Sequence, residues 1–82
     1  MSQFVYIIQS LKDGKYYIGE TANVEARLIY HNSGKQRSTR HRIPFRLVLF
    51  EVYPTRSEAL KREKEIKSWK SGIKFKELIT GQ

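Results

Sequence analysis

The chain has 82 residues, 16 Lys and Arg against 8 Asp and Glu for a formal net charge of +8, and no cysteine. This length indicates a single domain, residues 1–82, with one small core, and the lack of cysteine excludes disulfides and thiolate metal sites. The sequence has no run near the roughly 20 apolar residues of a membrane span and no signal-peptide pattern, so we expect a cytoplasmic protein.

The excess of basic residues bears on the partner. A strongly basic domain favours a polyanion, and nucleic acid is the partner that we expect. The alternative is a basic surface that is only solvated. An anionic membrane surface is disfavoured because no long helix pairs a continuous basic face with an apolar face.

The first structured stretch, residues 4–19, has the pattern of a β-hairpin. Asp13-Gly14 favours a tight two-residue turn, and β-branched and aromatic residues flank it on both sides. With that turn, Ile8 pairs with Gly19. A three-residue turn would reverse the parity of the two strands.

In this register, alternation along the strands divides the side chains between two faces. One face holds Tyr6, Ile8, Ser10, Tyr17 and Gly19, and the other holds Val5, Ile7, Tyr16 and Ile18. Tyr6 and Tyr17 then lie on the same face, staggered by about 13 Å. At that distance the two tyrosine side chains can act on one site only if another group lies between them.

The middle of the chain predicts a helix, a loop and a strand. The helix covers residues 24–32, with N-cap candidates in residues 21–23 and a C-cap signal after Asn32. Residues 35–42 have no periodic apolar positions and are rich in Lys and Arg, which predicts a basic loop. Residues 45–53 follow a proline and are nearly continuously apolar, which suits a buried strand.

The last third predicts two helices. Thr55 and Glu58 match a capping box that starts a helix running to about Trp69. Ser71-Gly72 breaks this helix, and residues 73–79 form a short final one. The order β-β-α-β-α-α indicates an α+β domain with a small antiparallel or mixed sheet covered by helices.

Glu63 breaks the pattern of its own helix. It falls about 40° from Ala59 on the helical wheel, inside the apolar arc, so its carboxylate faces the sheet. One interpretation is a ligand for Mg²⁺, which is held by one or two carboxylates together with phosphate and water. The alternative is a carboxylate at the wet end of the arc or one paired with a nearby Lys or Arg.

Arg27 and His31 are neighbours on the first helix because they are four residues apart. Each has a plain alternative, a solvated arginine and a structural or helix-end histidine. The alternative for Tyr6 and Tyr17 is that they are core residues whose hydroxyl groups reach the surface. Taken together with Glu63, however, these residues make a set suited to phosphodiester cleavage, with an arginine for phosphate, proton-handling groups and a carboxylate for a metal.

These residues have the order and spacing of a known pattern. Phe4-Val5-Tyr6, Tyr17-Ile18-Gly19, Arg27, the stretch 31–34 and Glu63 resemble the GIY-YIG nuclease superfamily. Over residues 4–70 the chain is similar to its small stand-alone bacterial members, which are related to the N-terminal nuclease domain of UvrC. The resemblance implies a three-stranded antiparallel sheet flanked by helices. It also implies a metal-dependent endonuclease that hydrolyses DNA, weakly sequence-specific or structure-directed, with a role in DNA repair or recombination.

The resemblance assigns a role to each residue of the set. Water activated by a tyrosinate or through His31 attacks the phosphate, and Tyr17 positions the water or the phosphate. Tyr6 matches the first motif tyrosine, Arg27 stabilises the charged transition state, and Glu63 binds Mg²⁺ or Mn²⁺.

Three features set the chain apart from larger relatives. Phe4 stands where the first motif has glycine, the polar residue that many relatives place after the glutamate helix has no clear match in residues 68–79, and no second domain recognises DNA. Binding therefore falls to basic residues that contact phosphates: Lys35, Arg37, Arg40, Arg42, Arg46 and Lys61. A protein partner that supplies specificity, an RNA substrate, a non-catalytic nucleic-acid-binding module and a bare scaffold stay open as alternatives.

Overall fold

Three antiparallel strands form one sheet in the order β2-β1-β3. The computed structural model of the protein describes residues 2–70 and 72–81. Its elements are β1 (Gln3–Ser10), β2 (Tyr16–Thr21), α1 (Val24–Asn32), a 3₁₀ turn (Arg40–Arg42), β3 (Phe45–Tyr53), α2 (Arg56–Trp69) and α3 (Ile73–Thr80). The predicted α+β class and the element order are confirmed. Ser71, part of the predicted helix break, lies outside the described residues.

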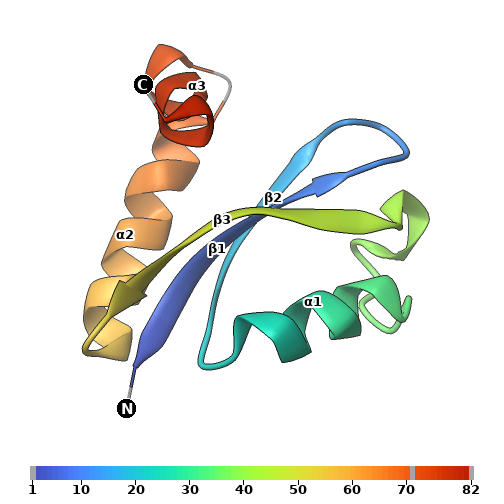
Figure 1. The fold of residues 1–82 in the computed structure, drawn as a ribbon, viewed down its shortest axis with the longest axis horizontal. Coiled ribbons are helices and arrows are strands. Elements are labelled where there is room, and N and C mark those ends of the chain that lie inside the picture. Colours follow the sequence, from blue (N-terminus) through green and yellow to red (C-terminus); the bar gives the residue numbers. More distant parts are fainter. Residues whose placement is uncertain (1, 71, 82) are drawn as a thin grey trace.

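Helices cover both faces of the sheet, with α1 on one side and α2 and α3 on the other (Figure 1). The buried residues accordingly form two clusters instead of the single core that we expected. One contains Val5, Ile7 and Ile18 of the sheet with Ala59, Ile66 and Phe75 of α2 and α3. The other contains Tyr6, Ile8 and Phe45, with Tyr17, Val24 and Leu28 packed against it. The predicted division of side chains between the two faces is therefore correct.

The hairpin turn differs from the prediction. Ser10 pairs with Lys15 through a main-chain bond of 2.9 Å, so the loop has four residues, 11–14, instead of two. The Ser10 hydroxyl accepts from the main-chain N–H groups of Lys12 and Asp13, and the Asp13 carboxylate accepts from Lys15 N–H. These side-chain bonds favour the longer loop. The register moves by two residues, which keeps the parity.

Strand β3 lies at an edge of the sheet, not in its buried centre as its composition predicted. Phe50 and Val52 remain 49% and 56% exposed, whereas β1, between the other two strands, has its residues 5–8 buried. Near-continuous apolarity does not distinguish these positions because α1 covers only part of the face to which Phe50 and Val52 belong.

Two polar contacts attach the helices to β3. The Asn32 side-chain amide at the end of α1 accepts from Phe45 N–H at 2.7 Å and donates to Phe45 C=O at 3.1 Å. On the other face, Arg62 of α2 makes two bonds with the Glu51 carboxylate, at 2.8 and 3.1 Å. Within the described ranges, no helix is long and apolar enough to cross a bilayer.

Candidate active site

Tyr6 lies at the centre of the α1 face of the sheet and is only 3% exposed. Its hydroxyl is 2.9 Å from His31 Nε2, and His31 Nδ1 is 3.1 Å from the Thr39 hydroxyl. Thr39 in turn donates to the main-chain carbonyl of Gln36 at 3.5 Å. β1, α1 and the basic loop thus meet in one buried chain of hydrogen bonds.

The Gln36 carbonyl lies 3.5 Å from the Thr39 hydroxyl. When Thr39 donates to it, the Thr39 oxygen accepts from His31 Nδ1–H, and His31 Nε2 accepts from the Tyr6 hydroxyl. Burial, together with the nearby charge of Arg27, lowers the pKa of His31 below its usual value. His31 is therefore neutral near pH 7.

Tyr17 lies beside this chain and is half-buried. Its ring centroid is 6.3 Å from that of Tyr6 and 4.8 Å from that of His31, and its hydroxyl accepts a hydrogen bond from Gln36 Nε2 at 3.2 Å. The predicted stagger of about 13 Å is wrong because the observed register pairs Ile8 with Tyr17. The two tyrosines are neighbours on one face and need nothing between them.

Gly19 makes room for Tyr6. The two residues pair directly across β1 and β2, and a Cβ atom at position 19 would overlap the Tyr6 hydroxyl and ring. Gly19 is needed here for the space that it leaves, since the close neighbour is a rigid buried ring. The last residue of the second motif thus positions the tyrosine of the first.

Four ionisable neighbours act on Tyr6. Its pKa is raised well above the usual value, mainly by burial and then by Tyr17, with further upward contributions from Glu63 and Glu20. Arg27 acts in the opposite direction and lowers it. The charges of Arg27 and Glu63 therefore reach the Tyr6 hydroxyl from two different helices, but Tyr6 stays a neutral phenol near pH 7. A standing tyrosinate is disfavoured at this position.

Glu63 lies on the side of α2 that faces the sheet, and its side chain is 16% exposed. Its carboxylate forms an ion pair with Lys67 at 3.4 Å, one turn further along the helix. The predicted inward orientation and the alternative of a lysine partner are both found. Among the described residues, no three His, Cys, Asp or Glu side chains lie close enough together to hold a metal ion.

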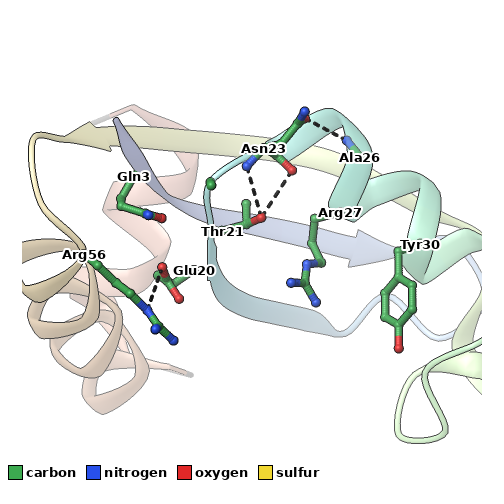
Figure 2. A pocket seen from close by; sticks show the side chains of 9 residues that line it. Gln3, Glu20, Thr21, Asn23, Ala26, Arg27, Tyr30 and Arg56 are labelled. Carbon is green, nitrogen blue, oxygen red and sulfur yellow. Dashed lines mark hydrogen bonds and ion pairs between the residues drawn. The ribbon is translucent and has the colours of Figure 1, made fainter. Parts of the chain in front are cut away.

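Arg27 lines an open hollow of about 560 Å³ between α1 and the start of α2 (Figure 2). The wall is formed by Gln3, Glu20, Thr21, Ala22, Asn23, Ala26, Arg27, Tyr30 and Arg56. Of the five predicted site residues, Arg27 alone borders this hollow. Tyr6 and His31 are buried beside it, Tyr17 is half-buried, and Glu63 lies on the opposite helix layer.

The basic residues predicted to contact DNA are mostly exposed. Lys35, Arg37, Arg40, Arg46 and Lys61 are open to solvent. Arg42 differs, because it is half-buried, pairs with Asp13 at 3.1 Å and lies over the Phe45 ring. It supports the hairpin turn and is a poor candidate for a phosphate contact.

Sequence reasoning missed several residues of this region. Thr39 and Gln36 hold His31 and Tyr17, but they sit in a loop without periodicity, where contacts across the fold leave no sequence signal. Glu20 and Arg56 pair at 3.5 Å from separate elements and were not considered. Glycine at position 19, inside a strand, is itself a signal of close approach.

The buried histidine predicts a pH dependence of stability. The pKa of His31 is lower in the folded protein than the 6.5 of an unperturbed side chain, so the unfolded state binds the proton first as pH falls. We expect the free energy of unfolding to decrease below pH 6.5, down to the folded-state pKa, and to receive no contribution from His31 above pH 6.5. Denaturant unfolding at a series of pH values measures this.

Two variants isolate the histidine. His31→Gln should flatten the decrease below pH 6.5, whereas His41→Gln, at an exposed position, should leave it unchanged. An equal decrease in the wild type and in His31→Gln would assign the effect to other groups.

Comparisons with known proteins bear on the family and the fold of the chain. A family model described as the GIY-YIG catalytic domain matches residues 2–76. A UPF0213 protein of Staphylococcus epidermidis is 47% identical over 79 residues, 95% of each chain, and one of Staphylococcus aureus is 48% identical over 69 residues, 83% of each chain. The solution NMR structure of a UPF0213 protein from Bacillus halodurans is 37% identical, with a TM-score of 0.62 over 100% of this chain and 86% of that one.

Proposed function

Because the chain belongs to the GIY-YIG catalytic-domain family, a nuclease family, we propose that it is an endonuclease that hydrolyses DNA phosphodiester bonds with Mg²⁺ or Mn²⁺. The observation that carries this proposal is the buried chain from Tyr6 through His31 to Thr39. The charges of Arg27 and Glu63 act on the Tyr6 hydroxyl in opposite directions, although the two residues come from helices on opposite faces of the sheet.

The contacts of His31 with Tyr6 at 2.9 Å and with Thr39 at 3.1 Å support a proton relay. As water attacks phosphorus, its proton passes to the Tyr6 oxygen while the proton of Tyr6 passes to His31 Nε2, so no free tyrosinate has to form. Thr39 holds the imidazole through Nδ1–H and keeps Nε2 directed at Tyr6. Tyr17, which is more accessible than Tyr6, positions the water or the phosphate. Arg27 neutralises the phosphate charge that develops in the transition state.

Glu63 is the residue that would hold the metal. Family members are generally dependent on a divalent metal. A single carboxylate fits Mg²⁺, which takes its other ligands from water and substrate phosphate, and an ion pair of 3.4 Å with an exposed lysine is easily exchanged. When bound, the ion polarises the phosphate and stabilises the leaving oxygen.

Binding of DNA is assigned to the exposed cations and is expected to be weakly sequence-specific or directed by DNA structure. Lys35, Arg37 and Arg40 lie in the loop next to the relay, which supports contact with the strand that is cleaved. Such contacts reach phosphates and carry little sequence information. A role in DNA repair or recombination, in the cytoplasm, is the setting that we propose for this activity.

The test is cleavage of single-stranded, nicked and branched DNA with Mg²⁺ or Mn²⁺, comparing the wild type with Glu63→Gln. Lys64→Gln is the control, because it alters an exposed neighbour on the same helix. We expect metal-dependent products that EDTA and Glu63→Gln both abolish. Activity that survives Glu63→Gln would refute the assignment.

The burial of Tyr6 at 3% exposure favours a second candidate, a non-catalytic nucleic-acid-binding module with the same fold. It predicts salt-sensitive DNA binding without metal-dependent products. The same panel of substrates therefore separates the two functions.

A further inference from the structure

The hollow bordered by Arg27 has features that the proposed cleavage reaction does not use. Arg27 enters it from α1 and Arg56 from the start of α2, on opposite sides (Figure 2). The first turn of α1, with Asn23 as its N-cap, forms part of the wall. Two guanidinium groups and the N-terminus of α1 therefore outweigh the one carboxylate in the wall, that of Glu20, and favour an anion in this hollow.

Arg56 forms an ion pair with Glu20 that leaves most of its guanidinium group free. Its Nε lies 3.5 Å from Glu20 Oε2, and its side chain is 70% exposed while that of Glu20 is 12% exposed. Within residues 2–70 and 72–81, no further polar contact of Arg56 is found. The terminal nitrogens of the guanidinium are thus directed by Glu20 and left to bind another acceptor.

Gln3 adds an observation of a different kind. Across the part of the chain that the structure describes, Gln3 Oε1 is the one buried side-chain N or O atom without a hydrogen-bond partner, and Gln3 lines this same hollow. A buried acceptor without a donor is costly. A ligand that brings an N–H or O–H group satisfies this oxygen once the Gln3 side chain turns toward the hollow, whereas a sulfate ion on the arginines has no donor to offer.

From these contacts we propose that the hollow is a nucleotide subsite, which holds one nucleotide of the substrate strand next to the cleaved bond. Arg27 binds the phosphate that is cleaved, and Arg56 binds the next phosphate, on the other side of the nucleotide. Gln3 Oε1 accepts a hydrogen bond from the base or the sugar of that nucleotide. A volume of about 560 Å³ lies in the range of small-ligand sites and accommodates a single nucleoside. The assignment of Arg27 rests on the proposed endonuclease function, whereas Arg56 and Gln3 are independent of it.

The first experiment measures binding of a short oligothymidylate to Glu63→Gln protein at several salt concentrations. Arg56→Gln should weaken binding by about tenfold and reduce the salt slope by about 0.7, as the loss of one single-strand phosphate contact predicts. Lys64→Gln removes the same charge from the exposed side of α2 and is the matched control. An unchanged salt slope in Arg56→Gln, or an equal loss in Lys64→Gln, would overturn the role of Arg56.

The second experiment follows side-chain NMR signals during titration with thymidine 5′-monophosphate or with sulfate, an anion without a hydrogen-bond donor. The nucleotide should shift both Arg56 Nε–H and the Gln3 amide, and sulfate only the arginine. Gln3→Met, which keeps the length of the side chain, should weaken binding of the nucleotide and not of sulfate. Identical effects of the two ligands would reduce the hollow to an anion site and overturn the proposal.

These readouts do not depend on cleavage. If no DNA is cleaved but the nucleotide shifts Gln3 and Arg56, the endonuclease function fails and the subsite stands. If DNA is cleaved and Arg56→Gln and Gln3→Met behave like the wild type in both assays, the subsite fails and the endonuclease stands.

Discussion

Replacing Tyr6 by phenylalanine is expected to lower the cleavage rate by about 10²- to 10⁴-fold, the usual contribution of a positioned proton-transfer group. The change removes one oxygen, which is hydrogen-bonded to His31 Nε2 at 2.9 Å, and keeps the ring that fills the α1 face. His31 Nε2 then has no donor inside the protein, so stability should fall by about 1–3 kcal/mol. Single-turnover cleavage and denaturant unfolding measure the two effects separately.

Tyr16→Phe is the matched control for this prediction. Tyr16 precedes Tyr17 on the same strand but faces the other layer, where its ring packs against Phe75 at 5.2 Å. Removing its hydroxyl should leave cleavage unchanged. If Tyr6→Phe cleaves DNA as fast as Tyr16→Phe does, the relay plays no part in the reaction.

Replacing Gly19 by alanine is expected to reduce both activity and stability, because the new Cβ would overlap the Tyr6 ring. Tyr6 is held from the other side by His31, so it cannot turn away without losing that bond. Overpacking of this kind costs about 1–3 kcal/mol, and displacement of the hydroxyl should lower cleavage as far as Tyr6→Phe does. Unfolding experiments and single-turnover cleavage report the two losses.

A double-mutant cycle shows whether the ring is the cause. With Tyr6→Ala the space over position 19 is open, and alanine is a better strand residue than glycine by about 0.5–1 kcal/mol. In that background Gly19→Ala should change from destabilising to neutral or stabilising. An equal loss in both backgrounds would place the effect in the strand itself.

The local elements of the fold could be predicted from the sequence because their signals are local. Asn23 and Thr55 cap the two long helices through side-chain bonds to main-chain N–H groups three residues on, as the sequence indicated. The assignment of strand residues to faces also holds, although the register was wrong, because a shift of two residues preserves parity. The GIY-YIG resemblance is confirmed by the match to the family model, and the α+β class by the fold itself and by the related solved structure.

The contacts that join the elements could not be predicted. The position of β3 at the edge depends on the order of the strands in the sheet, and the exposure of Phe50 and Val52 depends on how far α1 extends over their face; composition alone records neither. His31 was expected either in the cleavage set or as a structural or helix-end residue, and nothing in its helix predicted that it is completely buried with Thr39 and Tyr6 bonded to its two ring nitrogens. The predicted set of five residues remains a prediction as a catalytic site, with Tyr6 and His31 bonded and Glu63 linked to them only by its charge.

The side-chain amide of Asn32 allows the basic loop to change in length, although the loop also contacts His31 and Tyr17. Its two bonds to Phe45 join the chain on either side of residues 33–44, so the ends of the loop stay together whatever lies between them. With the ends fixed, each doubling of loop length costs only about 0.6 kcal/mol. Residues inserted at the exposed Lys35, outside the turn that main-chain bonds close between Gln36 and Thr39, can therefore vary in length and charge while Gln36 and Thr39 keep their places, and a new DNA preference can evolve there without rebuilding the sheet.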